Sequence, residues 1–177
     1  MNRIRSVLFC IAASALPALV QAATSEVSPA SLLVVLEQEI HAKPGEVYAD
    51  IGKVDKWWNK DHTFSHDAGN LSMQMAPGGC FCERWDGGAV LHGTVISLRK
   101  DSQVRLQTSL GPLQELAVTG VLTFTIAPRG EGTVLKLTYR VSGVPSSGLD
   151  KWAAPVDAML SEQLRRLASY AEKGAPE

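Results

Sequence analysis

The sequence lacks most of the signals that identify common enzyme and binding classes. Its 177 residues include only three cysteines and four histidines, and 17 basic residues nearly balance 18 acidic ones. The basic residues are dispersed and form no stripe with aromatics, which argues against a nucleic-acid partner. The sequence has no Ser-His-Asp order, Walker loop, dinucleotide-binding glycine pattern or convincing zinc motif, so we expect no cofactor and no metal.

The sequence also shows no internal repeat, low-complexity tract or interdomain linker. It begins with the pattern of a secretory signal peptide. Arg3 and Arg5 precede an apolar run at 7–20 that is too short to span a bilayer, and small residues follow at the expected cleavage site. We therefore predict a signal peptide at 1–22, an alternative being an uncleaved anchor. The remaining 23–177 would form one domain in the periplasm or outside the cell, with no membrane span.

One long helix is predicted near the C-terminus, because apolar residues recur there at helical spacing. Gly174 is a stop signal, and Pro155 either opens the helix or kinks a longer one. The apolar face comprises Trp152, Val156, Met159, Leu160, Leu164, Leu167 and Ala171.

Upstream of this helix the apolar period is mostly two, which is typical of strands. A polar leader at 24–30 precedes a strand at 31–40, a short helix at 44–51 and a second short turn at 54–58. About six antiparallel strands follow, at 71–75, 80–85, 89–100, 104–108, 118–126 and 134–141. This order predicts an α+β domain in which a curved antiparallel sheet wraps around the C-terminal helix, with two short helices after the first strand. A cavity between sheet and helix is the natural ligand site.

Several segments resemble the SRPBCC (START/Bet v 1-like) superfamily, near its activator-of-Hsp90-ATPase-like and polyketide-cyclase-like branches. They are Pro-Gly-Glu-Val at 44–47 leading to Trp57-Trp58, the turn at 77–79 and the stretch 132–143. The segments 57–63, 78–83 and 110–114 are similar to those of exported bacterial members. The resemblance implies a helix-grip fold with a hydrophobic cavity. It implies no single reaction, because members bind lipids, cyclise polyketides or assist other proteins.

Glu83 is the leading candidate for chemistry. It shares a strand face with Phe81 and Trp85, and we interpret this bulky face as cavity-lining. Between two aromatics a carboxylate would be partly desolvated, which raises its pKa and suits a general acid or a polar anchor. The alternative places Glu83 at the cavity mouth, hydrogen-bonded or paired with a basic residue.

The histidines are further candidates. His62 and His66 lie between the second short helix and the next strand, near the expected cavity mouth, and either could pair with Glu83. They could equally be ordinary loop residues, and their spacing does not demand a metal. His92 lies in the middle of a strand whose alternation is ambiguous, so its direction is not determined by the pattern.

Cys80 and Cys82 flank Phe81 on one strand. Residues two apart in a strand are about 6.5–7 Å apart, at the upper limit for a disulfide, so bridging them needs a bulge. The preceding glycines at 78–79 would allow one. A structural disulfide, two free thiols and a redox-active pair all remain open at this point.

Two hypotheses of function follow. The first is an exported protein that binds a small hydrophobic or amphipathic molecule. The second is a cyclase- or hydrolase-like enzyme in which Glu83 and a histidine, His62 or His66, move protons. The predicted ligand-binding residues are Trp57, Trp58, Leu71, Met73, Phe81, Glu83, Trp85, His92, Leu122, Phe124, Tyr139 and Met159.

Overall fold

The computed structural model describes residues 21–177, with side chains from residue 26 onward. The predicted signal peptide therefore lies outside the described residues, apart from its last two positions, Gln21 and Ala22, which belong to the first strand. Within this described part, every helix is too short or too polar to cross a membrane.

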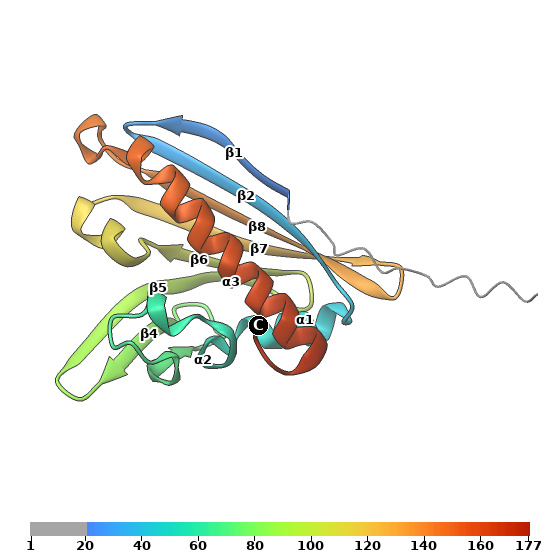
Figure 1. Cartoon of the computed structure of the whole chain (residues 1–177). Helices are drawn as coiled ribbons and strands as arrows, with labels where there is room; N and C mark the ends of the chain where they lie inside the picture. Colours follow the sequence, from blue (N-terminus) through green and yellow to red (C-terminus); the bar gives the residue numbers. More distant parts are fainter. Residues whose placement is uncertain (1–20) are drawn as a thin grey trace, which may run out of the picture.

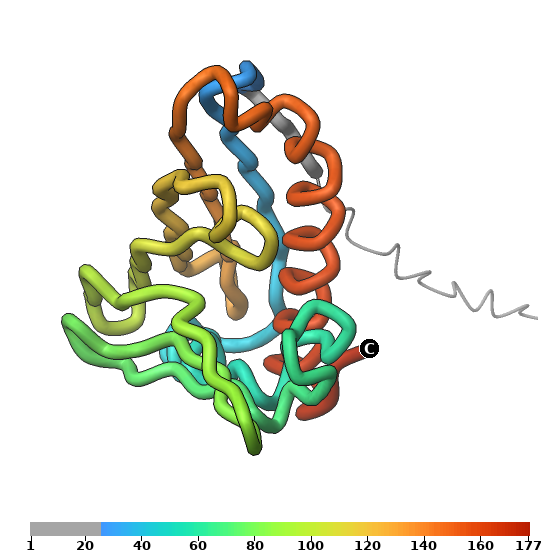
Figure 2. The backbone as a smooth tube through the Cα atoms, turned by 90° about the vertical axis from the view of Figure 1, so that its left-hand side faces the viewer, coloured from blue at the N-terminus to red at the C-terminus, as the bar shows by residue number. Residues whose placement is uncertain are grey.

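Eight antiparallel strands form one sheet in the order β1-β2-β8-β7-β6-β5-β4-β3. One long helix, α3 (Ala153–Lys173), lies diagonally across the sheet, which curves around it (Figures 1 and 2). The predicted α+β helix-grip fold is thus confirmed. The strands are β1 Gln21–Ser28, β2 Ser31–Ile40, β3 Leu71–Met73, β4 Cys80–Trp85, β5 Gly88–Arg99, β6 Gln103–Thr108, β7 Thr119–Arg129 and β8 Gly132–Ser142.

Two short helices, α1 (Pro44–Ile51) and α2 (Val54–Trp57), pack against α3 near its C-terminal end (Figure 1). Pro44 occupies the first position of α1, where its missing N–H costs nothing, and Glu46 accepts a hydrogen bond from the Lys43 N–H at 2.9 Å. The connections also contain 3₁₀ turns. These are η1 Lys60–His62, η2 Ala68–Asn70, η3 Gly111–Leu116, η4 Pro145–Ser147 and η5 Leu149–Lys151.

Helix α3 follows the predicted pattern closely. Pro155 lies in its first turn, so it opens the helix and does not kink a longer one. Gly174 ends the helix in the left-handed conformation, with φ of 73° and its N–H bonded to the Tyr170 carbonyl at 2.8 Å. The buried face packs mainly on β2 and contains Ala153, Val156, Leu160, Gln163, Leu164, Leu167, Ala168 and Ser169.

Strand β1 corrects the prediction of a polar leader at 24–30. The structure pairs β1 with β2 from Gln21 opposite Glu37 to Ser28 opposite Ser31. Its residues alternate only weakly in polarity, so the strand owes its place to backbone hydrogen bonds with β2 more than to a buried face. Where side chains are described, Arg140 of β8 also reaches across to Glu26, at 2.7 Å.

Candidate functional site

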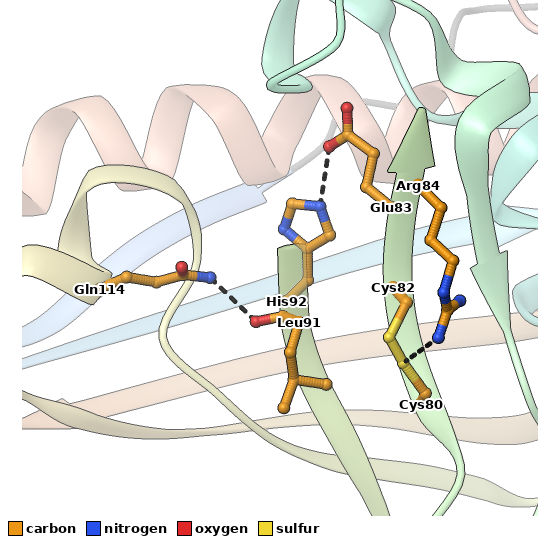
Figure 3. Close-up of a disulfide and its surroundings, with 7 residues drawn as sticks. All are labelled: Cys80, Cys82, Glu83, Arg84, Leu91, His92 and Gln114. Carbon is orange, nitrogen blue, oxygen red and sulfur yellow. Dashed lines mark hydrogen bonds and ion pairs between the residues drawn. A yellow bond between two sulfur atoms is a disulfide. The ribbon is translucent and has the colours of Figure 1, made fainter. Parts of the chain in front are cut away.

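A β-bulge in β5 brings His92 to the inner face of the sheet. Phe81 of β4 pairs with Gly93, whereas the next residue, Cys82, pairs with Leu91, so His92 is the extra residue of β5. Bulges redirect side chains and occur often beside functional sites. His92 is 5% exposed and Leu91 is 58% exposed, and their side chains point in opposite directions (Figure 3). The bulge therefore settles the direction of His92, which the sequence leaves ambiguous.

Glu83 is fully buried and completely hydrogen-bonded. One carboxylate oxygen accepts from the Ser65 N–H at 2.5 Å, and the other accepts from the Phe64 N–H at 3.1 Å and lies 2.9 Å from His92 Nε2. Burial raises the pKa of Glu83, but the hydrogen bonds from Ser65, Phe64 and His92 outweigh it and hold the pKa below the ordinary value. The predicted raised pKa is therefore wrong, because the loop between η1 and η2 solvates the carboxylate with its own N–H groups.

His92 is a neutral imidazole held between two aromatic rings. Its ring centroid lies 5.0 Å from that of Phe81 and 5.8 Å from that of Phe64. Burial lowers the pKa of His92, and the neighbouring Glu83 carboxylate only partly reverses this effect. Because an ionised carboxylate only accepts hydrogen bonds, His92 donates its Nε2–H to Glu83 and carries its remaining lone pair on Nδ1.

The Nδ1 atom of His92 is unpartnered and not fully buried, and His92 lines a pocket. Among the described residues, Gln163 Nε2 is the one fully buried side-chain nitrogen or oxygen without a hydrogen-bond partner. His92 makes its side-chain hydrogen bond through Nε2, so its unpartnered Nδ1 is not fully buried. His92 lines the pocket described below, and in Figure 3 the second ring nitrogen lies on the side of the ring away from β4. His92 thus brings an unpartnered acceptor to the pocket wall, and an anchored carboxylate holds its other ring nitrogen.

The pocket has a volume of about 440 Å³ and lies between the η1 region, the η3 loop and the first turns of α3. Aromatic and aliphatic side chains make up most of its wall, and His92 is its one contribution from the sheet. Its lining residues are Trp58, Asp61, His62, Thr63, Phe64, His92, Leu110, Gly111, Pro112, Leu113, Glu115, Trp152, Pro155, Val156 and Met159.

The charged groups of the pocket wall are acidic. Asp61 and Glu115 line it at exposed positions, and no lysine or arginine is among the described lining residues. Lys60, next to Asp61, pairs with that carboxylate at 2.7 Å from outside the wall. Across residues 21–177, no group of three or more His, Cys, Asp or Glu side chains is arranged to hold a metal ion.

His62 ties the pocket rim to α3. Its Nε2 lies 3.0 Å from Glu162, whose second oxygen accepts a hydrogen bond from the Asn59 side chain. Burial raises the pKa of Glu162, but the hydrogen bonds from Asn59 and His62 outweigh it and lower the pKa overall. His66 has φ of 58°, is exposed and does not line the pocket. Neither histidine pairs with Glu83, so the catalytic pairings expected from the sequence are replaced by Glu83–His92.

Of the predicted ligand-binding residues, Trp58, His92 and Met159 line the pocket. Glu83 lies behind His92. Trp85 is half-buried and covers Gly88, where an added Cβ would collide with its ring. The others pack into the apolar core, because the inner face of the sheet is filled by side chains from neighbouring strands and from α1 and α2. These core residues are Trp57, Leu71, Met73, Phe81, Leu122, Phe124 and Tyr139.

Tyr139 supports the pocket from the core. Its hydroxyl donates to the Thr108 carbonyl and accepts from the Leu110 N–H, each at 3.2 Å. Burial raises the pKa of Tyr139 to about 12, so the hydroxyl keeps its proton. This contact fixes the end of β6 and hence the start of the η3 loop that lines the pocket.

Cys80 and Cys82 form a disulfide with their Cα atoms 5.4 Å apart. The bond spans Phe81 and faces the His92 bulge in the adjacent strand (Figure 3). Arg84 Nη2 lies 3.9 Å from Cys80 Sγ on the exposed side. Of the alternatives left by the sequence, the structure shows the bridged pair, and the bulge beside it lies in the partner strand β5 and not in the strand that carries the cysteines.

Several pocket residues were not predicted from the sequence, notably Phe64, Leu110 and Leu113. The segment 110–114 carried a signal, since it is one of those that resemble exported family members. Phe64 has no such sequence signal, because it lies between two 3₁₀ turns and outside any strand with alternating apolar residues.

Comparisons with known proteins support the fold. The sequence matches no family model and no curated protein. CalU16 from Micromonospora echinospora has a TM-score of 0.58 at 11% identity, covering 89% of this chain and 88% of that one. The Aha1 dimer from Colwellia psychrerythraea has a TM-score of 0.59 at 19% identity, covering 80% and 97%. StfQ, a di-domain ARO/CYC from the steffimycin biosynthetic pathway, has a TM-score of 0.58 at 18% identity, covering 81% and 51%.

Identities this low establish the fold alone and transfer no activity. The curved eight-stranded sheet and the long C-terminal helix are shared with these structural neighbours, so this chain has the helix-grip fold that its resemblance to the SRPBCC superfamily implied.

Proposed function

We propose that this protein binds a small, mainly apolar molecule in the pocket and orients it by a hydrogen bond to His92 Nδ1. The observation that carries the proposal is the unpartnered Nδ1 acceptor of His92, a buried residue on an otherwise largely apolar wall. A volume of about 440 Å³ suits a ligand of a few rings or a branched chain. Trp58 and Trp152 offer flat surfaces for it, and Met159 offers an adaptable one.

The charge of the wall favours particular ligands. With Asp61 and Glu115 on the wall and no lysine or arginine among the described lining residues, an anionic ligand would be repelled by like charges. The preferred ligand is therefore a neutral or cationic molecule that carries a hydrogen-bond donor, such as a phenol or an enol. StfQ, which shares the fold, is an ARO/CYC protein from the steffimycin biosynthetic pathway, and this is compatible with a ligand of this kind.

The test is displacement of the neutral dye Nile red by three naphthalenes of equal apolar body. We expect 2-naphthol, which can donate to His92, to bind about 10-fold more tightly than 2-methoxynaphthalene, because one hydrogen bond contributes about 1 kcal/mol or slightly more. We expect 2-naphthoate to bind most weakly.

The variant His92→Phe should remove the preference for 2-naphthol, and His66→Ala, at an exposed loop position outside the pocket, should leave it intact. Failure of all three naphthalenes to displace the dye, or equal preference in His92→Phe and the unaltered protein, would refute the proposal.

We also propose that the chain is exported to the periplasm or beyond, as its first 22 residues indicate. Expressed with its own leader in a Gram-negative host, it should appear in the periplasmic fraction with a new N-terminus at Ala23 or Thr24. Intact leader on the cytoplasmic protein would contradict this.

A further inference from the structure

We propose that His92 is a general base that removes a proton from the molecule bound in the pocket, with Glu83 as its positioning residue. The inference rests on the proposed binding pocket and adds an activity to it. It concerns acidic C–H or O–H groups of neutral molecules, since these can place a proton next to Nδ1 without bringing a negative charge to the wall.

The geometry of the pair supports proton transfer. Two backbone N–H groups hold the Glu83 carboxylate, at 2.5 and 3.1 Å, and the carboxylate in turn holds His92 Nε2–H at 2.9 Å. This contact selects the tautomer with its lone pair on Nδ1, the unpartnered ring nitrogen. When Nδ1 takes a proton, the resulting imidazolium already has a buried counter-charge in hydrogen-bond contact. A histidine needed only for packing would require no anchored carboxylate and no unpartnered nitrogen.

The surroundings make Nδ1 an effective base. The rings of Phe64 and Phe81 flank the imidazole and limit its contact with water. The other titratable groups on the pocket wall are Asp61 and His62 from the η1 region and Glu115 from η3, while α3 contributes only uncharged side chains to it. A bound molecule can therefore reach the base through a mainly apolar site.

The probe reaction is the elimination of 5-nitrobenzisoxazole, which needs a base and no cofactor. Nδ1 of His92 takes the proton from carbon 3, the electron pair of that C–H bond becomes the third bond of a nitrile, and the N–O bond breaks. Its electron pair stays on oxygen, giving the coloured 2-cyano-4-nitrophenolate. The imidazolium then releases its proton to solvent, and the enzyme returns to its starting state.

We expect saturable turnover by the purified mature chain that is at least 100-fold faster than with free imidazole at equal concentration. His92→Gln should lower the rate at least 50-fold, and the exposed His66→Gln should leave it unchanged. The rate requires neutral His92, so it should rise with pH through the pKa of that imidazole. Because burial holds this pKa below 6.5, the rate should be constant above neutrality.

Glu83→Gln separates positioning from simple packing. The carboxylate raises the pKa of His92, so removing its charge should move the midpoint of the pH profile to lower pH and reduce the plateau about 10-fold. The midpoint should stay in His62→Gln, the other histidine of the wall. If Glu83→Gln does not fold, the comparison of the unaltered protein with His92→Gln, together with the pH profile of the unaltered protein, still decides the proposal.

Nile red displacement by 5-nitrobenzisoxazole distinguishes the binding proposal from the general-base proposal. Displacement with turnover no faster than in His92→Gln would overturn the general-base assignment and leave the binding function standing. Absence of both displacement and turnover would contradict both. A rate that falls equally in His66→Gln would also overturn the assignment to His92.

Discussion

The closed half of the helix-grip fold and its open end, where the pocket lies, differ in how their strands pair. In the closed half, β2, β8 and β7 pair without a break in register, and their inward side chains form solid core against α3. At the open end, β5 is irregular against both neighbours, at His92 toward β4 and at Ile96 toward β6. Regular strands thus produce a sealed core, and bulged strands produce a place where a polar side chain can face a pocket.

The two regions also treat polar groups differently. The inward face of β8 is apolar apart from Thr133 near its start and the Tyr139 hydroxyl. The open end instead buries an ionised Glu83 and a neutral His92, which are tolerated because backbone N–H groups and one another satisfy them. The closed half is therefore almost wholly apolar inside, whereas the open end holds the buried ionisable pair.

The largest change in stability should come from truncating a core residue of the closed half, as in Leu122→Ala of β7. Leu122 is 2% exposed, so its truncation should lower the free energy of unfolding by about 2–5 kcal/mol, measured in urea. Its neighbour Val121 is 38% exposed on the opposite face, and Val121→Ala should cost less than about 1 kcal/mol. If the folded Leu122→Ala variant lost Nile red binding more than 5-fold, Leu122 would belong to the pocket and not to the core alone.

Acid should weaken the open end first. The folded-state pKa of His92 lies below its ordinary value of 6.5, so the unfolded chain gains a proton there before the folded one, and stability falls as the pH drops below about 6.5. The folded-state pKa of Glu83 also lies below its ordinary 4.5, so its contribution is present above that pH and is lost as the pH falls further. Each group contributes a slope of at most about 1.4 kcal/mol per pH unit.

Urea unfolding from pH 7.5 to 3 measures these slopes. His92→Phe should flatten the slope just below pH 6.5, whereas His66→Gln should not reduce it by the same amount. A profile of His92→Phe that parallels that of the unaltered protein would mean that His92 does not couple to folding.

Removing the disulfide should have a smaller and local effect. Cys80 and Cys82 close a very short loop, so the double replacement by serine should cost about 1–2 kcal/mol at most by the loop-entropy argument. We expect amide hydrogen exchange to become faster in β4 and β5 while β7 and β8 keep their protection. Uniformly faster exchange across the sheet would mean that the two regions unfold as one unit.

The smallest effect should come from the rim pair of His62 and Glu162. Both side chains are about one-third exposed, so Glu162→Gln should change the free energy of unfolding by less than about 1 kcal/mol. Glu131→Gln, at the exposed turn between β7 and β8, provides the matched control and should have no measurable effect. A loss above 2 kcal/mol would place this pair among the groups that hold the fold together.

Most of the fold was predictable because its signals are local. The spacing of Val156, Leu160, Leu164 and Leu167 predicts α3, and Gly174 marks its end. Alternation predicts β7 and β8 for the same reason. Strand β1 was missed because its residues carry little periodicity, and it forms only where β2 offers a free edge to pair with.

Two residues of the site were predictable from the sequence, but their arrangement was not. Glu83 and His92 were both selected, yet neither the pairing nor the ionisation state followed from the pattern. A one-residue bulge reverses which side chains face inward, and no residue type signals it reliably. The raised pKa expected for Glu83 failed because residues 64–65, distant in sequence, supply the N–H groups that stabilise its charge.

Periodicity and turn residues by themselves determined that a curved sheet would enclose the C-terminal helix, since burying one apolar face of each element leaves few other arrangements. Tertiary structure alone decided that the inner face near Phe124 is filled, and that the open volume lies at one end, between η1, η3 and α3. It also decided that Glu83 meets His92. The physical reason is range: side-chain patterns act along one helix or strand, whereas packing, a bulge and buried hydrogen bonds join residues of different elements.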